Sequence, residues 1–132
     1  MKVRLFNISV KLSFPRKLNL EIRTEKVYYL DEKGNKKYLN LVLIQNTRGL
    51  KLENNDILKI ERILNKLVFL TYADLLHGEF NITALEVEVP DNIKKLICEG
   101  RITDREVGTS RRYVMNLFLR KDEYEVKQVK IL

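Results

Sequence analysis

The chain has one cysteine, one histidine, two prolines and no tryptophan among its 132 residues. The lone Cys98 excludes an intramolecular disulfide and a multi-cysteine zinc site, and the lone His77 excludes sites that need two imidazoles. No uninterrupted apolar run exceeds four residues, as in Leu67–Leu70, whereas a membrane-spanning helix needs about 20. The N-terminus alternates basic and apolar residues, unlike a secretory signal peptide. These absences predict a soluble, cytoplasmic protein with no membrane partner.

The residues that are present predict one folded domain over residues 1–132 with an uneven charge. Hydrophobic residues make up 45% of the chain and charged residues 33%, a mixture that can build a core. The net charge of +7 divides into +8 over residues 1–52, −4 over 53–100, +4 over 101–121 and −1 over the rest. Two basic segments flanking an acidic one are typical of a protein that binds a polyanion.

Alternating apolar and polar residues predict strands in the first third of the chain. Residues 4–14 are apolar at every even position from Phe6 to Phe14, the period of a half-buried strand. Residues 18–30 also alternate, but the parity changes near Thr24–Lys26, which predicts a β-bulge. Residues 31–35 contain Gly34-Asn35 and predict a hairpin turn that leads to a return strand over 37–45.

Two later segments have apolar residues at helical spacing. The first predicts an amphipathic helix over 55–77, with a possible break near 70–72. The second predicts a short helix over 91–99 and one further capped turn at 103–106. Alternation resumes in the remaining segments, which are predicted as strands over 80–89, 111–120 and 124–132. The predicted fold class is α+β: a mainly antiparallel sheet with one long amphipathic helix and one short helix.

Basic residues and tyrosines gather in the first strands, and a second arginine cluster follows a glycine-containing loop. Single-stranded nucleic acid needs cations along its backbone and flat rings on which its bases stack. The alternative is that the tyrosines pack as cross-strand pairs and the lysines are solvated. We predict a nucleic-acid-binding site for single-stranded DNA or RNA formed by Lys11, Arg16, Lys17, Arg23, Tyr28, Tyr29, Lys36, Lys37, Tyr38, Arg48, Arg111 and Arg112.

The same stretch resembles a known family. The order of strand, Asp31–Asn35 turn, strand, Arg48-Gly49-Leu50-Lys51-Leu52 and helix is similar to the transcriptional-coactivator and Whirly-like single-stranded-DNA-binding fold. The resemblance covers residues 4–70 and implies that a curved sheet and its hairpin contact single strands while the helix assists dimerisation. After Gly78 the chain adds a segment that the minimal family unit lacks.

Two other functions fit parts of the sequence. A small protein-interaction protein, or a viral or mobile-element accessory protein, would form a homodimer or bind another protein through helix 55–77. A divalent-metal nuclease would use Glu86, Glu88 and Asp91 as ligands, although two or three carboxylates on a strand are more often a solvated face. Cys98 and His77 fit a buried apolar position and a helix end better than a catalytic role. The sequence predicts no enzyme, no cofactor and no metal.

Overall fold

The computed structural model describes residues 1–14, 17–44, 51–71 and 73–132. Within these residues the chain forms eight strands, one α-helix and one 3-10 helix. The strands are β1 (Lys2–Leu12), β2 (Leu18–Leu30), β3 (Lys36–Tyr38), β4 (Val42–Ile44), β5 (Glu79–Glu88), β6 (Lys95–Asp104), β7 (Thr109–Arg120) and β8 (Glu123–Ile131), and the helices are α1 (Asn54–Val68) and η1 (Ala73–His77).

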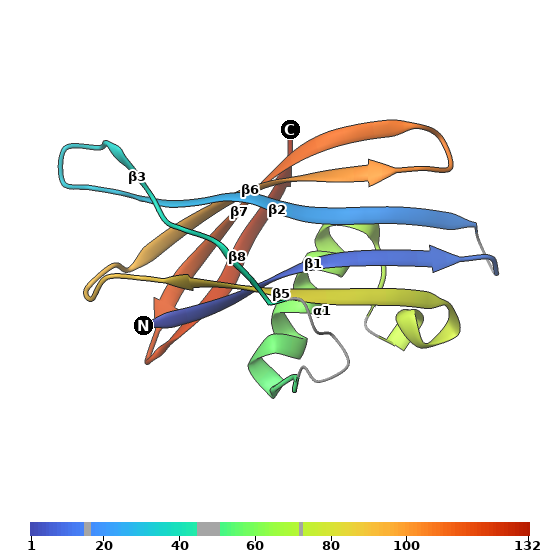
Figure 1. Cartoon of the computed structure of the whole chain (residues 1–132), viewed down its shortest axis with the longest axis horizontal. Helices are drawn as coiled ribbons and strands as arrows, with labels where there is room; N and C mark the ends of the chain where they lie inside the picture. Colours follow the sequence, from blue (N-terminus) through green and yellow to red (C-terminus); the bar gives the residue numbers. More distant parts are fainter. Residues whose placement is uncertain (15–16, 45–50, 72) are drawn as a thin grey trace.

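The strands form one antiparallel sheet in the order β4-β5-β1-β2-β6-β7-β8. Strand β2 pairs with β1 near its beginning and with β3 near its end, so β1 and β3 follow one another along the same edge of β2. The sheet is strongly twisted, since β7 and β8 run obliquely to β1, and α1 lies on one side of it (Figure 1). No helix among the described residues is long and apolar enough to cross a membrane.

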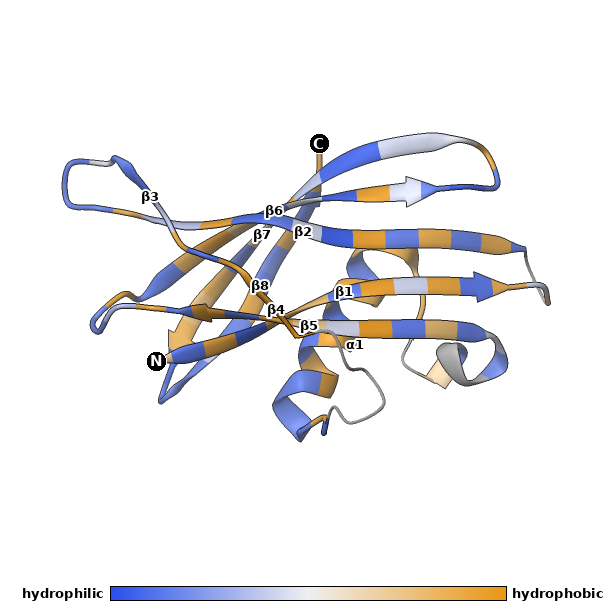
Figure 2. Ribbon diagram, viewed as in Figure 1, coloured by the Kyte–Doolittle hydropathy of each residue, from blue (hydrophilic) through white to orange (hydrophobic). Residues whose placement is uncertain are grey.

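The main part of the core lies between the sheet and α1, and a second part, with Leu5 and Val87, lies on the opposite face of β1 and β5. Phe6, Ile8 and Val10 are each about 1% exposed, and they belong to one buried cluster with Ile60 and Leu64 of α1. The alternation of hydrophobic and hydrophilic residues is visible along β1 and β5 (Figure 2). The predicted strand over 4–14 is confirmed as β1, and the bulge is confirmed because the β2–β6 register shifts between Thr24 and Lys26.

The predicted fold class is wrong in its helices. The sheet dominates the structure, and the one α-helix has 15 residues and ends at Val68. Phe69 takes the left-handed conformation, with φ of 56°, and the backbone N–H of Leu70 donates to the carbonyl of Leu64 (3.2 Å). This is the geometry that ends helices, and it separates α1 from η1, so residues 55–77 do not form one helix.

The short helix predicted over 91–99 is absent, and β6 takes its place. Asn92 has a φ of 68°, a left-handed conformation that turns the chain after Pro90. Leu96, Ile97 and Cys98 then lie in a strand and are 0–9% exposed. A strand buried on both faces has consecutive apolar residues, and over a short stretch these cannot be distinguished from a buried helix by periodicity.

Two smaller predictions also differ from the structure. The return strand predicted over 37–45 is divided, because β3 pairs with β2 whereas β4 pairs with β5. The capped turn predicted at 103–106 is the start of the β6–β7 hairpin connection, in which Asp104 accepts a hydrogen bond from the N–H of Glu106 (3.0 Å). The predicted capping box would join Thr103 to Glu106, whereas in the structure the side chain of Asp104 stabilises a turn.

A buried polar cluster attaches the beginning of α1 to β1. Arg4 forms an ion pair with Asp56 (3.1 Å) and also donates to the carbonyl of Lys51 (3.0 Å). The Asp56 carboxylate accepts the backbone N–H of Glu53 (3.1 Å), and the amine of Lys59 donates to the carbonyl of Arg4 (3.1 Å). Burial lowers the pKa of Lys59 below its ordinary 10.5, although the neighbouring Asp56 opposes the shift.

The lowered pKa of Lys59 predicts a pH-dependent stability. The folded protein binds this proton less tightly than the unfolded chain, so the charged amine costs stability at neutral pH, and the cost disappears as the pH rises towards 10.5. Each unit of lowering corresponds to about 1.4 kcal/mol. In urea unfolding, the stability of Lys59→Met relative to the unmodified protein should therefore fall as the pH rises through the lowered pKa of Lys59 towards 10.5.

The exposed Lys66 on the same helix provides the control. The stability of Lys66→Met relative to the unmodified protein should change little over the same pH range. A pH-independent difference for Lys59→Met would show that its amine titrates normally.

Candidate nucleic-acid interface

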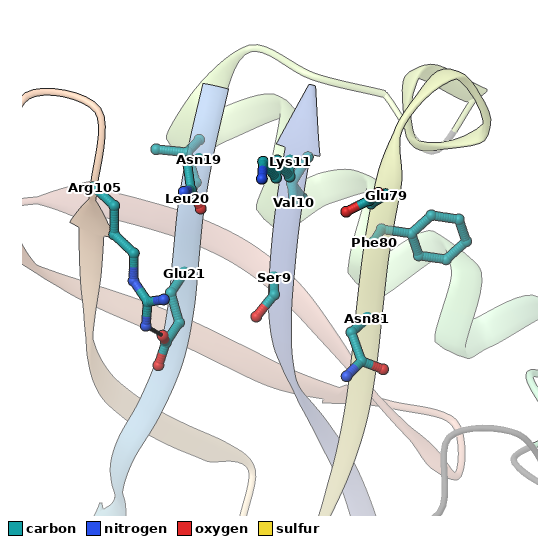
Figure 3. Close-up of a pocket in the computed structure, with 10 residues that line it drawn as sticks. All are labelled: Ser9, Val10, Lys11, Asn19, Leu20, Glu21, Glu79, Phe80, Asn81 and Arg105. Carbon is teal, nitrogen blue, oxygen red and sulfur yellow. Dashed lines mark hydrogen bonds and ion pairs between the residues drawn. The ribbon is translucent and has the colours of Figure 1, made fainter. Parts of the chain in front are cut away.

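The sheet face turned away from α1 is polar where β1 ends and β5 begins, whereas Val3, Leu5, Leu85 and Val87 on the same face near the other end are buried. Figure 3 looks onto one end of it, where Ser9, Lys11, Glu21 and Asn81 point away from the helix. These side chains line a shallow cavity of about 380 Å³ across β5, β1 and β2, together with Arg105. Lys11 and Glu79 are cross-strand partners here, so this end of the face has no marked excess of positive charge.

Farther along the same face, three arginines lie directly opposite one another on adjacent strands. Arg23 of β2 is the register partner of Arg101 of β6, which is in turn the partner of Arg112 of β7. Register partners share a face, and neighbouring strands are about 4.8 Å apart. We call Arg23, Arg101 and Arg112 the arginine row. The buried residues that follow or precede them, Ile22 and Tyr113, face the core.

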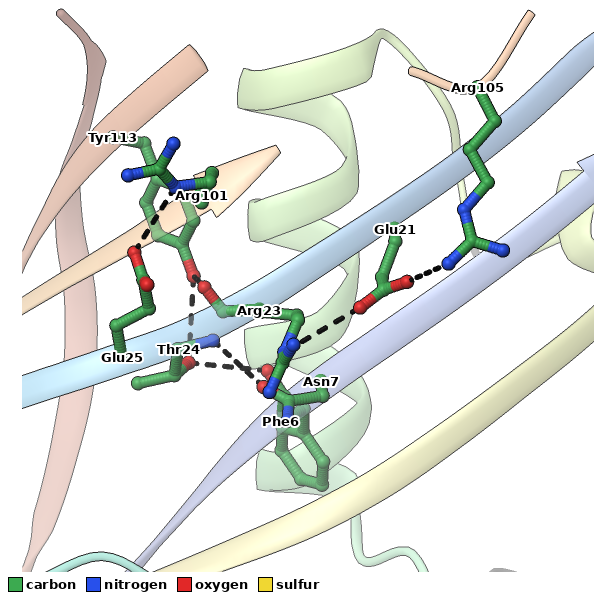
Figure 4. Close-up of polar contacts among 9 residues, drawn as sticks. All are labelled: Phe6, Asn7, Glu21, Arg23, Thr24, Glu25, Arg101, Arg105 and Tyr113. Atoms are coloured by element: carbon green, nitrogen blue, oxygen red, sulfur yellow. Dashed lines mark hydrogen bonds and ion pairs between the residues drawn. The ribbon is translucent and has the colours of Figure 1, made fainter. Parts of the chain in front are cut away.

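Two carboxylates partly neutralise the arginine row. Glu21 contacts both Arg23 (3.5 Å) and Arg105 (2.7 Å), and Glu25 contacts Arg101 (3.6 Å) (Figure 4). Arg112 has no ion pair within the described part of the chain. The arginine row therefore keeps a net positive charge. Like charges opposite one another on adjacent strands destabilise a sheet, so this arrangement does not contribute to the stability of the fold.

A rigid support lies beneath the arginine row. The hydroxyl of Tyr113 donates to the carbonyl of Arg23 (3.2 Å), and the backbone N–H of Thr24 donates to the side chain of Asn7 (2.8 Å). Gly100 is the register partner of both Thr24 and Tyr113, and a Cβ atom there would collide with the Tyr113 ring. Burial raises the pKa of Tyr113, so its hydroxyl remains a donor at neutral pH. These contacts fix the bulge that orients Arg23.

The same face continues to a pair of tyrosines. Tyr28 and Tyr38 are register partners whose ring centroids are 5.3 Å apart at an interplanar angle of 50°. The amine of Lys36 lies 4.9 Å from the centroid of the Tyr28 ring. Tyr28 is only 6% exposed, whereas Tyr38 is 57% exposed. The cross-strand pairing considered as the alternative is therefore present, yet one ring stays available for stacking.

The structure brings some predicted site residues together and separates others. Arg23, Arg112, Lys36, Tyr28 and Tyr38 share the exposed face, and Lys11 lies at its far end. Three predicted residues lie on the opposite face: Tyr29 and Lys37, which are register partners, and Arg111, which is the partner of the buried Ile102. Lys17 lies near a turn and forms an ion pair with Glu106 (3.7 Å). Arg16 and Arg48 lie outside the described residues.

Sequence reasoning left Arg101, Lys26 and Lys130 out of the predicted site. Lys26 is the register partner of Glu99, Glu99 of Val114, and Val114 of Lys130. Lys26 and Lys130 therefore lie on the exposed face, at the two ends of the row next to the arginine row. Arg101 follows the segment predicted as a helix, so the sequence analysis assigned Arg101 to neither face of the sheet. Gly100 and Ile102 on either side of Arg101 are buried, and this alternation could have placed Arg101 on the exposed face.

Several of the residues considered for other functions make contacts within the fold. Of the apolar residues of α1, Ile60, Ile63 and Leu67 are buried in the core, whereas Leu58 is 63% exposed. Cys98 is fully buried, and burial raises the pKa of its thiol to about 12. Glu88 is bound by the N-terminal amine of Met1 (3.1 Å). In the part of the chain that the structure describes, no three His, Cys, Asp or Glu residues are grouped for a metal ion.

The support beneath the arginine row predicts a strong effect of Gly100→Ala. The added methyl group would collide with the carbonyl of Arg23 and with the Tyr113 ring, so the free energy of unfolding should fall by about 3 kcal/mol. Gly34→Asn is the control, because nothing lies within 4 Å of a Cβ at Gly34 and Asn tolerates positive φ. Equal losses of stability for the two variants in urea titrations would contradict the described packing.

Comparison with known proteins adds no family assignment. No protein-family model matches the chain, and neither the curated proteins nor the solved structures contain a match. The resemblance of residues 4–70 to the single-stranded-DNA-binding fold therefore stays a prediction.

Proposed function

We propose that this protein binds single-stranded nucleic acid across the sheet face opposite α1. The observation that carries the proposal is the arginine row, in which Arg23, Arg101 and Arg112 align across three adjacent strands. Arginine donates paired hydrogen bonds to phosphate oxygens and remains charged at any physiological pH. Successive phosphates of a strand laid across β2, β6 and β7 would neutralise the three guanidinium groups. Such a ligand would be encountered in the cytoplasm.

The ion pairs on this face explain how the site would exchange partners. Side chains of Arg23, Arg101 and Arg105 are 46–65% exposed, so their contacts with Glu21 and Glu25 are surface ion pairs. Each such pair contributes only about 0–1 kcal/mol. Phosphates can replace these carboxylates at little cost, and the release of counterions from the nucleic acid favours the exchange.

The exposed ring of Tyr38 supports a single strand over a duplex. Bases that are not paired can stack on an aromatic side chain, which is worth about 1–3 kcal/mol per base. Tyr38 lies on the same face as the arginine row, five residues along β2 from Arg23 as measured at its partner Tyr28. At roughly 3.3 Å per residue the separation is about 17 Å, so one flexible strand can contact both.

Arginine substitutions provide the direct test. Arg23→Ala and Arg112→Ala should each weaken binding of a labelled single-stranded oligonucleotide about tenfold, because each removes a charge-assisted phosphate contact. Each should also lower the slope of log affinity against log salt by about 1. Fluorescence polarisation at several salt concentrations measures both quantities.

Arg111→Ala is the matched control, because it removes the same charge from the adjacent position on the opposite face. Its effect on affinity should be small. If Arg111→Ala weakened binding as much as Arg112→Ala, net charge would account for binding and the proposed face would be wrong. Absence of salt-sensitive binding by the unmodified protein would reject the function itself.

Tyr38 tests the single-strand preference separately. Tyr38→Ala should reduce the binding free energy for a single strand by about 1–3 kcal/mol and leave duplex binding nearly unchanged. Tyr38→Phe keeps the ring and should bind as the unmodified protein does. Equal losses for single-stranded and duplex ligands would contradict stacking on this ring, and thermal unfolding of both variants checks that the Tyr28–Tyr38 packing is preserved.

A further inference from the structure

Strand β8 is at one end of the sheet and pairs, within the described residues, only with β7. The N–H of Leu132 donates to the carbonyl of Arg112 in β7 (2.9 Å). Because N–H groups alternate sides along a strand, those of Val129 and Ile131 point away from β7. A nine-residue edge with unpaired backbone groups is a template for another strand.

The two halves of β8 carry opposite charges. Glu123 and Glu125 lie in the first half, and Lys127 and Lys130 lie in the second. An antiparallel strand of the same sequence would place the acidic half of one copy opposite the basic half of the other. Charge complementarity of this kind selects a second copy of the chain as the partner.

The bulge in β8 makes one register fit on both faces. The β7 register shifts between Asn116 and Leu117, so Tyr124, Val126, Val129 and Ile131 all face the core side. If Val126 of one copy lies opposite Val129 of the other, Tyr124 lies opposite Ile131 on the same face. On the other face the same register places Glu125 opposite Lys130. Without the bulge, Val126 and Val129 would lie on opposite faces of β8, and this register would not bring their side chains together.

The region beside α1 has space for this contact. Leu58 of α1 is 63% exposed and lines, with Arg62, Glu125 and Val126, a cavity of about 380 Å³. Val129 and Ile131 are only half-buried. In the register above, Val129 of the second copy would lie beside Val126, which lines this cavity. We propose that two copies of this chain form a symmetric dimer by antiparallel pairing of their β8 strands, with Val126 opposite Val129 and Glu125 opposite Lys130.

The first test is the mass in solution. Sedimentation velocity or light scattering should give twice the 15.7 kDa of one chain. Val129→Pro removes an N–H that points away from β7, a position where an edge strand tolerates proline, and should give a folded monomer. Val129→Thr keeps the N–H and a β-branched side chain and should remain dimeric. A monomeric unmodified protein, or a dimeric Val129→Pro variant, would overturn the proposal.

A charge exchange keeps the proposal testable even if Val129→Pro fails to fold. Glu125→Lys places two cations opposite each other, and Lys130→Glu places two anions opposite each other, so each variant alone should dissociate. A mixture of the two variants restores opposite charges at both contacts and should form a heterodimer. No heterodimer in the mixture, or undiminished self-association of either variant, would contradict the proposed register. Because no nucleic acid is needed, the outcome is independent of the proposed function.

Discussion

The register between β2, β6 and β7 is the constraint on which the rest of the structure depends. It is fixed where Thr24 and Gly100 meet and where the Tyr113 hydroxyl binds the carbonyl of Arg23. A slip of one residue would turn every side chain to the other face and would bring Arg101 into the core. The same contacts therefore bury the apolar residues under α1 and align the arginines on the opposite face, so stability and the candidate site have one origin.

The arginine row does not help the protein to fold. Directly opposed like charges lower the stability of a sheet, and Glu21 and Glu25 reduce this cost without balancing Arg112. Arg23 belongs to the first basic segment, and Arg101 and Arg112 belong to the second, so residues far apart in the sequence align on one face. The acidic segment instead supplies Asp56, which holds the beginning of α1 against Arg4.

Much of the sheet was predictable from the sequence, as was the beginning of α1, whereas the end of that helix and the second helix were predicted wrongly. The alternation from Phe6 to Leu12 and the change of parity at Thr24–Lys26 reflect one buried face and a bulge, and both predictions are confirmed. The segment around Leu96–Cys98 is buried on both faces, so its apolar run carries no period of two. The helix was extended too far because Phe69 is a left-handed residue other than glycine. Of the site, Arg23 and Arg112 were predicted, but their alignment with Arg101 depends on long-range strand order that local patterns do not contain.

The most direct test of this account is an NMR titration that follows the arginine side-chain Nε–H signals while a single-stranded oligonucleotide is added. The account predicts that the signals of Arg23, Arg101 and Arg112 shift together and saturate at the same ligand concentration, while that of Arg111 on the opposite face stays in place. Shifts spread over both faces, or centred on Arg62 of α1, would contradict it.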